Sequence, residues 1–145
     1  MECFLIISKT PYRISFFGGG SDYPEWYQKY GGEVISATIN KHIYITCKKL
    51  PNFFNLKYRI IYSKIENVNK VSEISHTAVK HALKFSKIKD GLELHYHGDL
   101  PARSGMGSSS SFLVGLLNVL RCYENKRFSK KDLAKQSINF EQNIL

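Results

Sequence analysis

Short runs of β-branched and aromatic residues, several with apolar and polar positions in alternation, dominate the first part of the chain and predict strands. The predicted strands are residues 3–7, 13–17, 33–36, 43–48, 58–62 and 92–97. The last is the clearest, because apolar side chains at 92, 94 and 96 alternate with polar ones. A Thr10-Pro11 pair separates the first two runs, so we expect two strands there.

Helical spacing appears mainly later in the chain. The predicted helices are residues 22–30, 77–85, 112–123 and 129–145. The third has the strongest pattern, because its apolar residues recur three and four positions apart after a run of serines. Gly31-Gly32 ends the first helix, and Ser129 with Asp132 forms a capping-box pattern at the start of the last. These elements predict one α+β domain, a β-sheet packed with helices.

Composition narrows the class of protein. The 145 residues are 43% apolar, which is enough for one ordinary core, and the net charge of +9 favours anionic partners. The basic residues are spread along the chain, a pattern that does not favour nucleic acid. Three widely spaced cysteines support neither a disulfide framework nor a zinc site. With no signal-peptide pattern and no apolar run beyond about half a membrane span, we expect a cytoplasmic protein that does not associate with membranes.

The segment at 101–109 carries the most chemical information. Gly105 and Gly107 bend the chain, and Ser108 and Ser109 open the apolar helix that follows. Glycines let a backbone approach an anion closely, and the unpaired N–H groups at a helix start attract phosphate. No Gly-Lys-Ser/Thr follows, so this is not a P-loop. The alternative interpretation is a flexible connector that caps a core helix.

A second glycine segment follows the strand predicted at 13–17. Arg13 stands at the start of that strand, and the Gly18–Gly20 turn presents Ser21 and Asp22 at its end. A carboxylate is a bidentate acceptor suited to sugar hydroxyls, and Arg13 can hold a phosphate or stabilise charge that develops during phosphoryl transfer. The alternative is a hairpin turn in which Asp22 caps a helix and Arg13 is solvated.

Together, these segments resemble the first two motifs of the GHMP kinases, a family that includes galactokinase, homoserine kinase and mevalonate kinase. The matching stretches are residues 11–23, 44–46, 57–64 and 98–112. Within the family they resemble the D-glycero-D-manno-heptose 7-phosphate kinases most closely. The resemblance implies that residues 1–145 form the ribosomal-S5-domain-2-like amino-terminal lobe, with a mixed sheet. It also implies a domain truncated at its C-terminal end, without the carboxyl-terminal lobe.

The resemblance implies that ATP and Mg²⁺ bind to this lobe. The ATP-binding residues would be Pro101, Ala102, Arg103, Ser104, Gly105, Met106, Gly107, Ser108 and Ser109. The sugar-binding residues would be Gly19, Gly20, Ser21 and Asp22. Ser108 or Ser109 would ligate magnesium with Glu141, and Arg13 would act near the transferred phosphoryl group. A solvent-facing helical Glu141 is the alternative. Galactokinase has a bulkier Glu-His in place of Gly19-Gly20, a departure that argues for a larger, already phosphorylated sugar.

The implied reaction transfers the γ-phosphoryl group of ATP to the anomeric hydroxyl of D-glycero-D-manno-heptose 7-phosphate, a step toward GDP-heptose for lipopolysaccharide or capsule. Three alternatives stay open: a kinase of another sugar such as fucose, an inactive fragment, and an RNA-binding module of the same fold. Because the family's catalytic Asp would lie beyond Leu145, we expect residues 1–145 alone to bind nucleotide weakly and not to turn over.

Two further groups of side chains have open interpretations. His95 and His97 lie on one face of a predicted strand, as in some metal sites, but no third ligand is evident. Aromatic residues gather in the first predicted helix, at Tyr23, Trp26, Tyr27 and Tyr30. They suit either stacking on a sugar or packing in the core or between subunits, and the last of these would make a homodimer.

Overall fold

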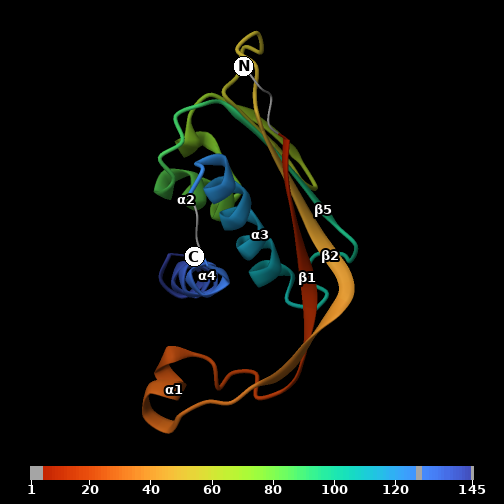
Figure 1. Cartoon of the computed structure of the whole chain (residues 1–145), viewed down its shortest axis with the longest axis vertical. Coiled ribbons are helices and arrows are strands. Elements are labelled where there is room, and N and C mark those ends of the chain that lie inside the picture. Colours follow the sequence, from red (N-terminus) through yellow and green to blue (C-terminus); the bar gives the residue numbers. More distant parts are fainter. Residues whose placement is uncertain (1–4, 127–128, 145) are drawn as a thin grey trace.

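The computed structural model describes residues 5–126 and 129–144, and its strands form one sheet in the order β1-β2-β5-β3-β4 (Figure 1). The strands are β1 (Leu5–Phe17), β2 (Ile35–Lys49), β3 (Tyr58–Ile61), β4 (Ile65–Val68) and β5 (Leu92–Gly98). β3 pairs with β5 in parallel, and the other neighbouring strands pair antiparallel. The sheet is therefore mixed, as expected.

Three of the helices cover one face of this sheet, with α3 against the β1–β2 pair (Figure 1). The helices are α1 (Pro24–Tyr30), α2 (Thr77–Phe85), α3 (Ser108–Tyr123) and α4 (Lys130–Asn143), with a 3₁₀ turn η1 (Val71–Glu73). The core lies between α3 and the sheet, where Tyr12, Ile43, Ile45, Leu113 and Leu116 are buried. In the described part of the chain, no helix has the length and apolarity to cross a bilayer.

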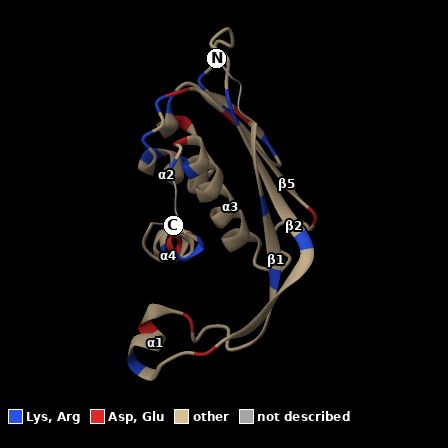
Figure 2. Ribbon diagram, in the orientation of Figure 1, with Lys and Arg blue, Asp and Glu red and all other residues tan. Residues whose placement is uncertain are grey.

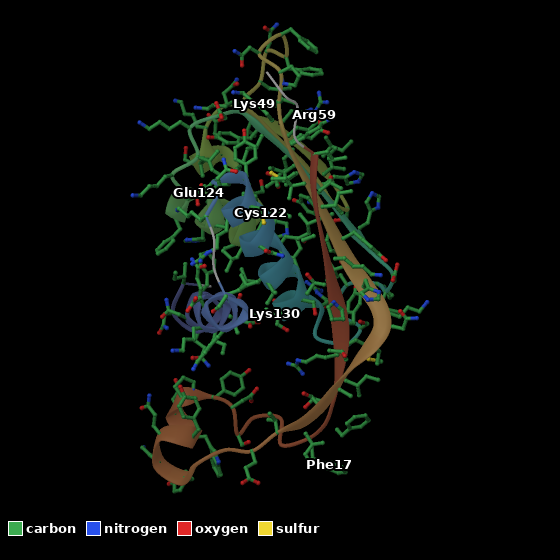
Figure 3. The ribbon with its side chains drawn as sticks, in the orientation of Figure 1. Phe17, Lys49, Arg59, Cys122, Glu124 and Lys130 are labelled. Atoms are coloured by element: carbon green, nitrogen blue, oxygen red, sulfur yellow. The ribbon has the colours of Figure 1, made fainter. Side chains whose placement is uncertain are left out.

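α1 lies apart from this core, at the end of a projection that we call the arm (residues 18–34), which joins β1 to β2 (Figure 1). Phe17, where β1 enters the arm, is 72% exposed (Figure 3). No residue of α1 is buried. Because so little apolar surface is covered, the arm contributes little to the core.

α3 is fixed to β1 by two hydrogen bonds and by a close approach at a glycine. The Ser8 hydroxyl donates to the Gly115 carbonyl at 3.1 Å, and the Ser111 hydroxyl donates to the Pro11 carbonyl at 2.9 Å. A Cβ at Gly115 would lie 2.9 Å from Thr10 Oγ1, so only glycine permits this approach of helix to strand. The N-terminus of α3 therefore has a set position relative to β1.

The predicted break between the first two strands is wrong. Residues 13–17 and the described part of 3–7 belong to the single 13-residue strand β1, and residues 3 and 4 lie outside the described residues. Pro11 sits inside β1, with a register shift between Pro11 and Arg13. β1 is an edge strand of the sheet, where the missing N–H of a proline costs no ladder bond and a bulge absorbs the irregularity.

Some of the other predicted strands and helices are confirmed, and others are not. Residues 35–36 and the predicted strand 43–48 belong to one 15-residue strand, β2, residues 33 and 34 lie outside it, and β4 was not predicted. The bounds of α2 are confirmed, as is the Ser129–Asp132 capping box that opens α4. Leu145, the predicted end of that helix, lies outside the described residues. Over the part of the chain that the structure describes, Lys and Arg residues are distributed over sheet and helices, without one basic block (Figure 2).

Candidate functional site

The loop that leads into α3 has the backbone geometry of an anion site. Arg103, Gly105 and Gly107 have positive φ angles of 63°, 73° and 69°. The Ser111 N–H makes the first intrahelical bond, to the Gly107 carbonyl at 3.0 Å, so helix geometry leaves the N–H groups of residues 108–110 without intrahelical partners. These groups, with the helix dipole, favour a bound anion.

Arg13 of β1 lies against the loop that leads into α3. The Arg13 N–H donates to the Met106 carbonyl at 3.1 Å, which joins β1 to the loop. A Cβ at Gly107 would lie 2.9 Å from Cγ of Arg13. Gly107 is therefore needed both for its φ angle and for the close approach of Arg13, rather than only for the approach of a ligand.

A cavity of about 530 Å³, which we call the Asp22 cavity, opens between the arm, β1 and α4. Its lining residues are Arg13, Ser21, Asp22, Tyr27, Gly32, Val34, Ser110, Ile138, Glu141 and Gln142. A guanidinium, Arg13, and two carboxylates, Asp22 and Glu141, thus meet in one space although they are up to 128 residues apart in the chain. Ser110 was not predicted as a site residue.

Hydrogen bonds within the arm determine how Asp22 is presented. The Asp22 carboxylate accepts the Gly20 N–H at 3.0 Å, and the Ser21 hydroxyl donates to the Glu33 carbonyl at 3.0 Å. The alternative in which Asp22 caps α1 is wrong, because the N-cap is Tyr23 and no side chain caps the helix. One Asp22 oxygen is used locally, and carboxylate chemistry leaves further acceptor capacity for a ligand.

A second cavity, of about 310 Å³, lies on the other side of the α3 N-terminus, and we call it the aromatic cavity. Its lining residues are Tyr62, Ser63, His76, Ala78, Tyr96, Ala102, Arg103, Ser108, Ser109, Phe112 and Leu113. The His76 ring stacks on Phe112 at 5.0 Å between centroids, and Tyr62 meets His76 edge-on at 4.9 Å. Burial lowers the pKa of His76, partly opposed by Glu66, so the ring is neutral at pH 7.

The predicted ATP and sugar residues divide between these cavities and the backbone that supports them. Ala102, Arg103, Ser108 and Ser109 line the aromatic cavity, and Arg13, Ser21, Asp22 and Glu141 line the Asp22 cavity. The remaining predicted residues line neither, namely Gly19, Gly20, Pro101, Ser104, Gly105, Met106 and Gly107. The serines and Glu141 proposed as magnesium ligands face different cavities, and that site stays a prediction.

Sequence reasoning found only part of the aromatic cavity. Tyr62 and Ser63 fall within 57–64 and Phe112 within 98–112, stretches quoted above for their family resemblance, but His76 carries no motif. The aromatic wall forms only when β3, α2 and α3 pack together, so only the cavity residues within 101–109 were predicted to bind ATP.

The remaining candidates from the sequence have separate outcomes. His95 and His97 lie on one face with ring centroids 3.9 Å apart, and within residues 5–126 and 129–144 no third metal-binding side chain joins them. Core packing of the α1 aromatics is wrong, since Tyr23 and Tyr30 are 64% and 71% exposed. Tyr27 lines the Asp22 cavity, where stacking on a sugar remains a prediction.

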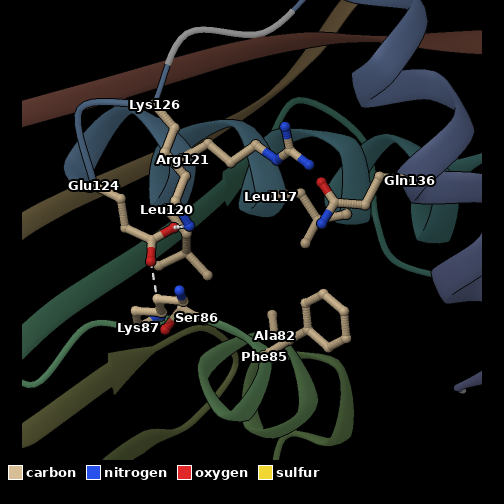
Figure 4. A pocket seen from close by; sticks show the side chains of 10 residues that line it. All are labelled: Ala82, Phe85, Ser86, Lys87, Leu117, Leu120, Arg121, Glu124, Lys126 and Gln136. Carbon is tan, nitrogen blue, oxygen red and sulfur yellow. Dashed lines mark hydrogen bonds and ion pairs between the residues drawn. The ribbon is translucent and has the colours of Figure 1, made fainter.

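A third cavity, of about 340 Å³, lies among α2, α3 and α4 and holds none of the predicted site residues (Figure 4). Apolar side chains such as Leu117 and Leu120 form part of its wall. The carboxylate of Glu124 accepts the backbone N–H of Lys87 at 2.7 Å at its edge. This carboxylate already has a structural partner, and the cavity is separate from the candidate site.

Comparison with known proteins shows which protein family the chain belongs to. Residues 69–145, more than half of the chain, match the family described as GHMP kinases N terminal domain, and the chain belongs to that family. It is 28% identical to the D-glycero-alpha-D-manno-heptose 7-phosphate kinase of Campylobacter jejuni, over 97% of this chain and 44% of the relative. It is 26% identical to a homoserine kinase of Staphylococcus epidermidis, over 77% of this chain and 37% of the relative.

Solved structures share the fold. A D-glycero-D-manno-heptose 1-phosphate kinase from Bacteroides thetaiotaomicron matches with a TM-score of 0.81 at 21% identity, over 97% of this chain and 48% of that one. The mevalonate kinase of Methanococcus jannaschii matches with a TM-score of 0.69 at 22% identity, over 95% and 47%. The predicted family and α+β fold are confirmed. The chain spans less than half the length of these proteins.

Proposed function

We propose that this chain is the nucleotide-binding lobe of a kinase that transfers the γ-phosphoryl group of ATP to the anomeric hydroxyl of D-glycero-D-manno-heptose 7-phosphate. The observation that supports it is the placement of the α3 N-terminus between two cavities. Ser108 and Ser109 line the aromatic cavity, and Ser110 lines the Asp22 cavity. A triphosphate bound at this helix end would have its base on one side and its terminal phosphate toward the other.

In this proposal the aromatic cavity takes the base and the loop takes the phosphates. Flat aromatic side chains suit a heteroaromatic base, and Arg103 lies at the loop side of the cavity as a cation for phosphate. The N–H groups that open α3 would bind the phosphate oxygens. Arg13 would stabilise the charge that develops on the transferred group, which is the main role of protein groups in phosphoryl transfer.

The Asp22 cavity takes the acceptor sugar. Asp22 and Ser21 would bind its hydroxyls, and Tyr27 would contact the ring. Glu141 and the serine hydroxyls at the start of α3 are hard oxygen donors of the kind that Mg²⁺ prefers, although Ser108 and Ser109 line the aromatic cavity and Glu141 lines the Asp22 cavity. We assign magnesium to Glu141 and to Ser108 or Ser109 by the family resemblance, and bound magnesium would neutralise charge on the phosphates.

The choice of substrate rests on similarity and on the arm. The Campylobacter jejuni relative, a heptose 7-phosphate kinase, is matched over nearly all of this chain. Galactokinase has a bulkier Glu-His in place of Gly19-Gly20, a difference that favours a larger sugar, although neither glycine lines the Asp22 cavity itself. The phosphorylated heptose that this kinase would make would serve in the cytoplasm as a precursor of surface polysaccharide. The homoserine kinase relative makes homoserine the second candidate acceptor, matched over a smaller part of the chain.

The test is calorimetric titration of this chain with Mg·ATP, heptose 7-phosphate, fucose and homoserine. We expect heptose 7-phosphate to bind most tightly, and Asp22→Ala to weaken it about tenfold or more, because a hydrogen bond to a charged group contributes roughly 1.5–3 kcal/mol. ATP affinity should change less than twofold, on the order of the noise of such mutant comparisons. Glu25→Gln is the control, since Glu25 is an exposed acidic residue of α1 that does not line the cavity.

If Asp22→Ala weakened sugar binding and ATP binding equally, Asp22 would not belong to the sugar site. If homoserine bound more tightly than the sugars, the acceptor would be an amino acid and not a sugar. We expect no turnover by this chain alone, and fast ADP release in a coupled assay would contradict that expectation.

A further inference from the structure

Glu66 of β4 ties together two walls of the aromatic cavity without lining the cavity itself. One carboxylate oxygen, Oε1, accepts the Tyr62 hydroxyl at 2.8 Å and the His76 backbone N–H at 3.1 Å. The other, Oε2, accepts the Ser75 backbone N–H at 2.5 Å. A single side chain thus joins the residue that follows β3 to the chain that opens α2.

The charge states of Glu66 and Tyr62 strengthen the hydrogen bond between them. Burial raises the pKa of Glu66, but hydrogen bonds from Ser75, Tyr62 and His76 outweigh burial and leave that pKa below its ordinary value. Burial, together with the nearby carboxylate, raises the pKa of Tyr62 to about 12. At neutral pH a charged carboxylate therefore accepts from a protonated phenol, and charge-assisted hydrogen bonds of this kind are roughly twice as strong as neutral ones.

Two of the residues that Glu66 holds, Tyr62 and His76, line the aromatic cavity. Tyr62 and His76 are in edge-to-face contact, and His76 stacks on Phe112. His76 Nδ1 is buried without a hydrogen-bond partner among the described residues, so no bond from that atom holds the ring in place. Backbone attachment through Glu66 and packing against Phe112 are then what keep the His76 ring in the cavity wall.

We propose that Glu66 is a positioning residue for the base of the nucleotide, holding Tyr62 and the start of α2 so that a flat heteroaromatic base enters a preformed aromatic wall. The inference rests on the proposed nucleotide-binding function. A wall that is already ordered does not lose side-chain freedom when the ligand binds, and this raises affinity for the base. The phosphates bind at the α3 N-terminus, away from Glu66, and their binding is independent of it.

The experiment compares ligands with and without a base. Mg·ATP and magnesium tripolyphosphate are titrated calorimetrically into the 145-residue chain and into Glu66→Gln, Tyr62→Phe and Glu73→Gln variants. Glu73 is the matched control, because its carboxylate also accepts two backbone N–H groups, those of Asn69 and Lys70 at 3.1 Å, but it does not line the cavity.

We expect the unmodified chain to bind ATP more tightly than tripolyphosphate. Glu66→Gln should weaken ATP binding about fivefold to tenfold, because part of the stacking on the base is lost, and should change tripolyphosphate binding less than about twofold. Tyr62→Phe, which keeps the ring, should weaken ATP about threefold, the effect of one ordinary hydrogen bond. Glu73→Gln should leave the ratio of the two affinities unchanged.

Each contrary result has a distinct meaning. An equal loss for both ligands in Glu66→Gln would reduce Glu66 to a general structural role and overturn the inference. Equal affinity of the unmodified chain for ATP and tripolyphosphate would overturn it too, while leaving the phosphate site intact. Failure of the unmodified chain to bind either ligand would overturn the proposed function itself. If Glu66→Gln does not fold, Tyr62→Phe decides, and an unchanged affinity ratio in that variant overturns the inference.

Discussion

Gly107 and Gly105 form a matched pair that tests how Arg13 is placed. Both have positive φ angles, 69° and 73°, where a Cβ costs about 1–2 kcal/mol. A Cβ at Gly107 would lie 2.9 Å from Cγ of Arg13, whereas one at Gly105 meets no atom within 4 Å. We expect Gly105→Ala to lower the free energy of unfolding by about 1–2 kcal/mol, and Gly107→Ala by about 1–3 kcal/mol more, the usual cost of overpacking.

The assay is urea unfolding followed by circular dichroism, for both alanine variants, with Arg13 present and with Arg13→Ala. Arg13→Ala removes Cγ, so the steric part of the Gly107→Ala cost should vanish, while the φ strain and the poorer N-cap remain. The expected coupling energy between positions 107 and 13 is about 1–3 kcal/mol, and that between 105 and 13 is near zero. A cost of Gly107→Ala that is the same in both backgrounds would refute the steric argument.

Two other predictions concern stability. The pKa of His76 lies below 6.5 because of burial, and that of Glu66 lies below 4.5 because its hydrogen bonds outweigh burial, so the unfolded state binds protons at higher pH than the folded state. The free energy of unfolding should therefore fall as pH drops, first through 6.5 and then through 4.5, in urea titrations; a flat profile would contradict this. Ser129→Ala should cost about 0.5–2 kcal/mol, because Ser129 Oγ accepts the Asp132 N–H at 3.1 Å, whereas Ser129→Thr keeps the cap and should cost less.

The parts of the site that were predictable are those whose chemistry is local in the chain. The serine run with Gly105 and Gly107 predicts a helix start with the backbone geometry of an anion site, because glycine freedom and unpaired N–H groups depend on a few consecutive residues. The capping box at Ser129 is predictable for the same reason. Neither needs knowledge of what packs around it.

The parts that were not predictable depend on distant packing. Proline interrupts most strands, and β1 continues through Pro11 only because β1 is an edge strand of the sheet. Residues 35–36 and the predicted strand 43–48 are joined within β2 through residues 37–42, and this stretch is held in the sheet by pairing with β1, which lies far away in the sequence. The aromatic cavity joins Tyr62, His76 and Phe112 from three elements, and no spacing rule connects them.

The core holds the two ends of the candidate site to different degrees. Arg13 lies on β1, and β1 is bonded to α3 through Ser8 and Ser111, so this cation and the N-terminus of α3 belong to one packed unit. Asp22 belongs to the arm, whose helix α1 buries no residue. Segments with little buried apolar surface open at low free-energy cost. The end proposed to bind phosphate is therefore fixed by the core, and the end proposed to bind sugar depends on contacts that the core does not supply.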